Sequence, residues 1–214
     1  MNLMNQDNIV HVILNKIGDI VLCNLLFLLC CIPVVTIGPS LTALYHCMLR
    51  TVKGNLNGAV KTFFRAFREN FRQSLTVWLL ILAAGLILLF NIRFLQSRTE
   101  SAALALLWCS AGILCLLFLF ALYIFPVIAA FSNRLSALCR NAFLLAFMHF
   151  PTTLLLAVIT LLPMYITCQD LELLPLYAFC WFFFGFGLTA FLNSLLLYRI
   201  FKKLLPPEED IREA

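Results

Sequence analysis

The side chains most suited to chemistry in this sequence are cations and aromatic rings that share one short stretch. The stretch covers residues 60–74 and reads VKTFFRAFRENFRQS. Both kinds of side chain recur at helical spacing: Lys61, Phe64, Arg65, Phe67, Arg68, Phe71 and Arg72. This pattern predicts a helix at a membrane surface, with its cations facing anionic lipid headgroups. The same residue types are favoured anchors at protein interfaces, so docking of a cytoplasmic partner is the alternative.

A second stretch places two prolines and a glycine inside an apolar run. Residues 30–46 read CCIPVVTIGPSLTALYH. Pro33 has no N–H to donate, and the residue before Pro39 is pushed out of the helical region. We therefore predict a helix, a short extended link, and a second helix that is capped by Ser40 or Thr42.

The link in this broken segment is a candidate functional element. Irregular backbone is costly in lipid, so the link should lie against protein or water. Discontinuous helices of this kind often line transporter sites. The residues that would form such a site are Pro33, Thr36, Gly38 and Pro39. An ordinary exit from the membrane into an interfacial helix is the other interpretation.

The groupings that catalysis and metal binding require do not appear in the sequence. Asp19 is the only acidic residue in the predicted spans, so paired carboxylates are missing. The histidines, at 11, 46 and 149, show no ligand spacing. The nine cysteines form no CxxC pair and are interpreted as packing residues. We therefore expect no catalytic, cofactor-binding or metal-binding residues and no enzymatic activity.

The composition points to a membrane protein. Of the 214 residues, 63% are hydrophobic and 12% are charged. A soluble domain carries about 45–50% apolar and about 25% charged residues. A chain of this length cannot hide the excess in one core, because a small soluble domain still needs a wide polar surface. The sequence therefore predicts an integral membrane protein.

Five apolar runs are long enough to cross a bilayer as helices. They lie at 17–36, 74–92, 104–130, 143–167 and 173–197. We predict an all-α bundle of about five spans, the first of them broken at Pro33 and Gly38-Pro39, plus the amphipathic cytoplasmic helix. The bundle forms one transmembrane domain over 1–205, followed by a short polar tail at 206–214.

Charge placement predicts the orientation of the chain. Most of the fifteen basic residues lie in the connections 47–73 and 131–142 or near the C-terminus. The positive-inside rule then places the C-terminus in the cytoplasm and the N-terminus outside. If residues 40–49 return into the bilayer, the N-terminus moves inside instead. The predicted location is the cytoplasmic membrane.

Several polar residues lie inside the predicted spans. They are Asn24, Thr36, Asn91, Tyr123 and Asn193. Polar side chains in such positions commonly form hydrogen bonds between helices. We interpret these residues as formers of hydrogen bonds between helices.

Two motifs carry a resemblance to a known family. The segments IPVVTIGPSLTALY and FFRAFRENFRQS resemble the signature of the YesL-like family of bacterial integral membrane proteins. The similarity extends to FPVIAAF and NAFLLAFMHFPTTLLL further along the chain. The family is a domain of unknown function, so the resemblance supplies no catalytic residue. Its members tend to be encoded near genes for carbohydrate uptake, which implies a role beside sugar import.

Two functions follow as expectations. The first is an accessory or regulatory component of bacterial carbohydrate uptake, with a sugar-transporter subunit as partner. The second is a small solute permease or channel that uses the broken link. Nucleic acid is not an expected partner, because the positive charge is local and adjoins a membrane span. The small residues in FFFGFGLTAF would allow close helix packing within the chain or between copies.

Overall fold

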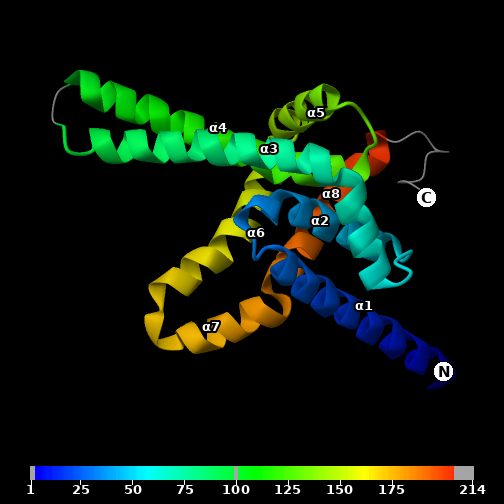
Figure 1. Cartoon of the computed structure of the whole chain (residues 1–214). Coiled ribbons are helices and arrows are strands. Elements are labelled where there is room, and N and C mark those ends of the chain that lie inside the picture. The colour runs from blue at the N-terminus through cyan, green and yellow to red at the C-terminus, as the bar shows by residue number, and fades with distance from the viewer. Residues whose placement is uncertain (1–2, 99–100, 205–214) are drawn as a thin grey trace.

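The structure is a computed structural model that describes residues 3–98 and 101–204. Every regular element in this part of the chain is helical (Figure 1). The α-helices are α1 (Leu3–Cys30), α2 (Ile37–Lys53), α3 (Ala59–Leu95), α4 (Ser101–Ala130), α5 (Leu135–Met148), α6 (Phe150–Gln169), α7 (Leu174–Cys180) and α8 (Phe186–Leu204). Two 3₁₀ turns, Val34–Thr36 and Leu171–Leu173, and a π-helical turn, Trp181–Gly185, complete the elements.

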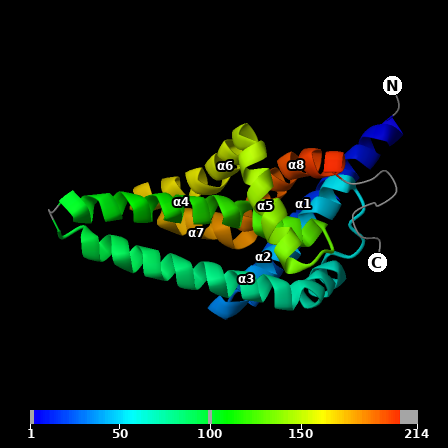
Figure 2. The same cartoon turned by 90° about the horizontal axis from the view of Figure 1, so that it is seen from above.

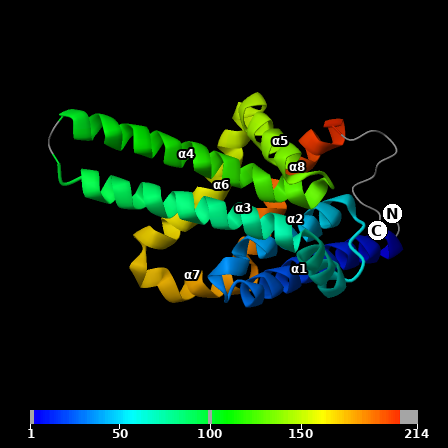
Figure 3. The same ribbon diagram turned by 45° about the horizontal axis from the view of Figure 1, so that its top comes forward.

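Two helical hairpins extend from a common core. Helices α3 and α4 form the longer hairpin, and α6 and α7 form the other (Figures 1 and 2). The last turn of α3, the first turn of α4 and the 3₁₀ turn Leu171–Leu173 lie at one end of the molecule (Figure 1). The first turn of α1 and the last turn of α8 lie at the opposite end in all three views (Figure 3). The predicted tail at 206–214 lies outside the described residues.

Helix α2 is the centre of the core. It packs against α1, α3, α4 and α8, and every residue from Gly38 to Leu49 except Leu41 is buried. Gly54 ends the helix in the left-handed conformation, with φ of 79° and its N–H bonded to the carbonyl oxygens of Arg50 and Thr51. The fold therefore closes around the helix that follows the broken segment.

The prediction of an all-helical membrane bundle is confirmed. Within the described residues, four helices are long and apolar enough to cross a membrane: Ala59–Leu95, Ser101–Ala130, Phe150–Gln169 and Leu174–Lys203. They contain the second and third predicted spans, the fifth except for residue 173, and most of the fourth. The first predicted span corresponds to α1 and the break after it, and α1 is not among these four helices. The chain is thus a multi-pass membrane protein.

The predicted start of the fourth span at 143 is wrong. Helix α5 ends at Met148, His149 leaves the helical region with φ of −114° and ψ of 48°, and α6 begins at Phe150. Pro151 explains the break, because in a continuous helix its missing N–H and its ring would face the carbonyl of residue 147. In the first turn of a new helix the missing N–H costs nothing.

The predicted link and caps of the broken segment also need correction. Pro33 is extended, but residues Val34–Thr36 form a 3₁₀ turn that leads directly into α2. The hydroxyls of Ser40 and Thr42 cap nothing and instead donate to carbonyl oxygens four residues earlier. Helix α2 starts earlier than predicted because the first turn of a helix tolerates a proline. The N–H groups of that turn have no partner within the helix, so the missing N–H of Pro39 removes no hydrogen bond.

The amphipathic segment is not a separate helix. Residues 60–74 form the beginning of α3, which continues without interruption through the second predicted span. The helix has 37 residues and is therefore about 55 Å long, which exceeds a hydrocarbon core of about 30 Å. The basic segment is thus attached directly to a membrane-spanning helix.

Candidate functional site

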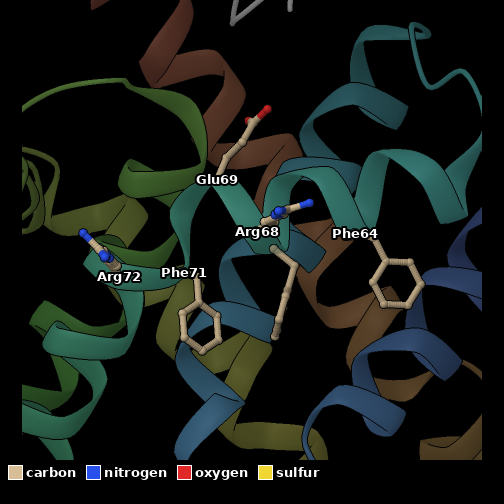
Figure 4. A pocket seen from close by; sticks show the side chains of 6 residues that line it. Phe64, Arg68, Glu69, Phe71 and Arg72 are labelled. Atoms are coloured by element: carbon tan, nitrogen blue, oxygen red, sulfur yellow. The ribbon is translucent and has the colours of Figure 1, made fainter.

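An open groove lies on the first half of α3. Its volume is about 540 Å³, and its lining consists of Phe64, Phe67, Arg68, Glu69, Phe71 and Arg72 (Figure 4). We call this surface the α3 groove. In Figure 4 the rings of Phe64 and Phe71 point to the same side of the helix, whereas the carboxylate of Glu69 points away from them.

The opposite face of α3 explains why the groove faces outward. That face is buried and made of small or polar residues with one ring: Thr62, Phe63, Ala66, Asn70, Ser74 and Val77. The hydroxyls of Thr42 and Ser74 lie 2.7 Å apart, which joins this face to α2. Asn70 satisfies its amide within its own helix by donating to the carbonyl oxygen of Ala66. Packing of small residues against α2 thus leaves the larger rings and the cations on the surface.

The aromatic rings of the groove support one another. The centroids of Phe67 and Phe71 are 5.5 Å apart with tilted planes, a favourable aromatic arrangement. Phe64 is 44% exposed, and its ring meets that of the buried Phe63 edge-on. The rings therefore form a partly preformed apolar floor beside two guanidinium groups.

The structure gathers five of the seven predicted residues of this segment. Lys61 is exposed and Arg65 is partly buried, but neither lines the α3 groove. Arg68 lies in line with the phenylalanines, so the predicted separation into a basic face and an aromatic face is incomplete. Glu69 also lines the groove, although the sequence-based prediction did not include it. Its place next to Arg68 in the sequence could have indicated that it lies on the same surface.

The broken segment satisfies its own backbone. Thr36 donates from Oγ1 to the carbonyl oxygens of Cys30 at 2.6 Å and Pro33 at 2.8 Å. Trp78 of α3 donates from Nε1 to the carbonyl oxygen of Val34 at 2.8 Å. The bends of the chain therefore leave these carbonyl groups paired, as a membrane environment requires.

The four candidate link residues differ in their surroundings. Pro33 is exposed, and Thr36 is partly buried and bonded within the link. Gly38 and Pro39 are buried in the first turn of α2. A Cβ at Gly38 would collide with the Cβ of Trp78 and lie 2.7 Å from the carbonyl oxygen of Ser74. This half of the segment is thus tightly packed against α3.

Three of the five predicted interhelical polar residues join helices. Asn24 of α1 donates to the carbonyl oxygens of Trp181 and Phe182 and accepts from the N–H of Gly187. Tyr123 of α4 joins α6, because its hydroxyl forms a hydrogen bond with that of Thr153. Asn193 of α8 joins two further helices through its side-chain amide. Thr36 instead bonds within its own segment, and Asn91 is exposed on α3.

The fold defines a multi-pass helical membrane protein, and the comparisons with known proteins agree with the resemblance seen in the sequence. Residues 20–92 match the family described as "Protein of unknown function, DUF624". This region contains the broken segment, α2 and the α3 groove. The two motifs that carry the resemblance, at residues 32–45 and 63–74, lie within this match.

A curated relative extends the similarity. The chain is 29% identical over 135 residues to "Uncharacterized protein YesL" of Bacillus subtilis (strain 168). The match covers 62% of this chain and 63% of the length of the relative. No solved structure matches the chain. Neither description states an activity.

Proposed function

We propose that this chain is an accessory membrane protein that docks a second protein through the α3 groove. The observation that supports this role is the outward-facing stripe of three phenylalanines and two arginines on a helix that continues into the membrane. Aromatic and arginine side chains are the residues that most often carry binding energy at protein interfaces. The chain acts here as a binding component and not as an enzyme.

Charge favours a protein over anionic lipid as the occupant of the groove. Glu69 lies next to Arg68 and one helical turn from Arg72, so the lining is not uniformly positive. A surface with both positive and negative charges suits a protein segment that also carries both. The complementary charges of the two proteins then fix how the segment is positioned on the surface. The Glu69 carboxylate lowers the net positive charge that an anionic headgroup would meet at this surface.

The proposed partner is a subunit of a carbohydrate-uptake transporter. This part of the proposal rests on the family resemblance, which implies a role beside sugar import. The α3 groove lies in the region that matches the family, so relatives share the segment that would dock.

We propose that the groove end of the molecule faces the cytoplasm. The positive-inside rule supports this placement, because most basic residues lie in α2, in the first half of α3, between α4 and the end of α5, or in the last turns of α8. The proposal puts the N-terminus on the same side, and it is supported by the first turn of α1, which lies at the same end of the molecule as the last turn of α8 (Figures 1 and 3). The proposal takes α2, which contains residues 40–49, as the segment that returns into the bilayer. Protease digestion of an N-terminal tag in intact spheroplasts tests it, since protection is expected and digestion would contradict it.

Crosslinking in native membranes tests the docking role. A photoreactive phenylalanine analogue at Phe67 samples the groove, and the same analogue at Phe90, which is 75% exposed on the same helix, is the matched control. A transporter subunit captured at 67 and not at 90 is the expected result. Lipid adducts alone at both positions would contradict docking and make this surface a membrane anchor.

A solute permease is the less supported alternative. It requires space along the broken segment, whereas Gly38 is pressed against Trp78 and Ser74. Solute flux in liposomes that contain this chain alone would favour the permease.

A further inference from the structure

A second polar site lies within the membrane part of the fold, away from the α3 groove. Asn193 belongs to α8, one of the four candidate membrane spans, and its side chain is 1% exposed. Its Nδ2 donates to the hydroxyl of Tyr45 on α2 at 3.3 Å and to the hydroxyl of Thr160 on α6 at 3.0 Å. Three helices therefore meet at one amide.

The amide of Asn193 is left half satisfied. Its Oδ1 has no hydrogen-bond partner among the described residues, although the atom is buried. The hydroxyls of Tyr45 and Thr160 form no other hydrogen bond in that part of the chain. A buried polar atom without a partner is costly, and in native proteins such atoms commonly bind an ordered water molecule or ion.

Rotating the amide by half a turn does not remove the deficit. The two ends of an asparagine amide are exchanged without a change in shape, and their assignment follows from the hydrogen bonds. In the exchanged orientation Oδ1 accepts from both hydroxyls, and Nδ2 is then the buried group without a partner. The cluster thus needs an additional donor in one orientation and an additional acceptor in the other.

We propose that this cluster binds a hydroxyl group, supplied by a water molecule or by a small polyol. A hydroxyl donates and accepts, so it satisfies the free end of Asn193 in either orientation. It carries no charge, which fits a cluster composed only of an amide and two hydroxyls. This site does not depend on the docking role of the α3 groove.

The polar cluster borders the surface of the molecule on the α6 side. Thr160 is only partly buried, so the polar cluster lies one side chain below the surface between α6 and α8. The neighbouring hydroxyl of Ser194, on the same helix, is also buried and without a partner in the described chain. The unpaired hydroxyl of Ser194 adds a second buried polar group on this helix that lacks a partner among the described residues.

Solid-state NMR of the full chain in lipid bilayers tests the proposal. With ¹⁵N-labelled asparagine, magnetisation is transferred from water to the side-chain amides. Asn24 is the internal control, because it is equally buried but its amide is fully paired with backbone groups. Sequential assignment identifies both signals, and loss of one signal in Asn193→Leu checks the assignment if that variant folds.

Two arms of the experiment distinguish the sources of the hydroxyl. The bound hydroxyl belongs to water if magnetisation transfer from water builds up several-fold faster at Asn193 than at Asn24 and added glycerol does not shift the Asn193 signal. A saturable shift of the Asn193 signal on glycerol addition, with loss of water transfer, identifies a polyol. Transfer as slow as at Asn24, together with no glycerol shift, would overturn the proposal.

Discussion

The indole nitrogen of Trp78 donates a hydrogen bond to the carbonyl oxygen of Val34 over 2.8 Å, which ties α3 to the break between α1 and α2. Gly38 lies against the same tryptophan, where an added Cβ would meet the Trp78 Cβ and the Ser74 carbonyl oxygen. This small area joins the broken segment to the helix that carries the α3 groove. We therefore expect that the addition of a single carbon atom in this area lowers the stability of the fold.

Gly38→Ala is expected to destabilise the fold. The new methyl group must displace the Trp78 side chain or the α3 backbone, and overpacking of this kind costs about 1–3 kcal/mol. The measurement is thermal unfolding in detergent, followed by fluorescence-detected size-exclusion chromatography. Gly85→Ala is the matched control, because Gly85 lies in α3 with no atom within 4 Å of its added Cβ. Equal melting temperatures for the two variants would contradict the close contact.

Asn24→Leu is expected to lower stability through the π-helical turn. Asn24 satisfies two carbonyl oxygens and one N–H of the turn region, and each buried group left unpaired costs about 1–3 kcal/mol. The same unfolding assay measures the loss. Asn91→Leu, at an exposed position on α3, should leave the melting temperature nearly unchanged. A stable Asn24→Leu protein would show that the turn forms without this amide.

Thr153→Val is expected to weaken the connection between α5 and α6. Thr153 donates to the carbonyl oxygen of Ala146 at 2.8 Å and lies 2.9 Å from the buried Tyr123 hydroxyl. The valine has similar shape but leaves both partners unpaired, at a cost of about 1–3 kcal/mol. Limited proteolysis between α5 and α6 should become faster. Thr76→Val is the control, since this exposed hydroxyl bonds only within its own helix.

Charge reversal of Arg68 and Arg72 to glutamate is expected to abolish partner capture. Three acidic residues and no basic residue would then line the α3 groove, so a partner would meet a negative surface instead of a positive one. Co-purification from native membranes measures the loss. The control is Arg98→Glu, on an exposed residue near the tip of the α3–α4 hairpin. Retention of the partner by the double variant would exclude docking through these cations.

The α3 groove was largely predictable because it arises from local periodicity. Cations and rings at helical spacing face the same way in any helix, so Phe64, Phe67 and Phe71 are found together as expected. Burial of the other face is a tertiary effect, since it depends on α2 packing against Ala66 and Ser74. For this reason the sequence indicated the groove but not which cations would line it.

The elements that were mispredicted depend on contacts between distant residues or on a single proline. Apolar composition continues through residues 143–167, so the break at His149 is visible only if Pro151 is given more weight than hydropathy. The π-helical turn has no local signal, because the amide that pairs with it belongs to Asn24, more than 150 residues earlier. The burial of α2 likewise follows from the helices around it.

The π-helical turn between α7 and α8 sets the rotational phase of one helix relative to the other. A π turn holds one residue more than the α-helix it interrupts, and each residue of an α-helix turns the chain by about 100°. Removing one residue from 181–185 would therefore rotate the whole face of α7 by about a quarter turn or more. The indole of Trp181 would leave the Thr167 hydroxyl to which it now donates at 2.9 Å. A single-codon deletion here would thus turn the side chains that α7 presents to the lipid, while the composition of the span stayed almost the same.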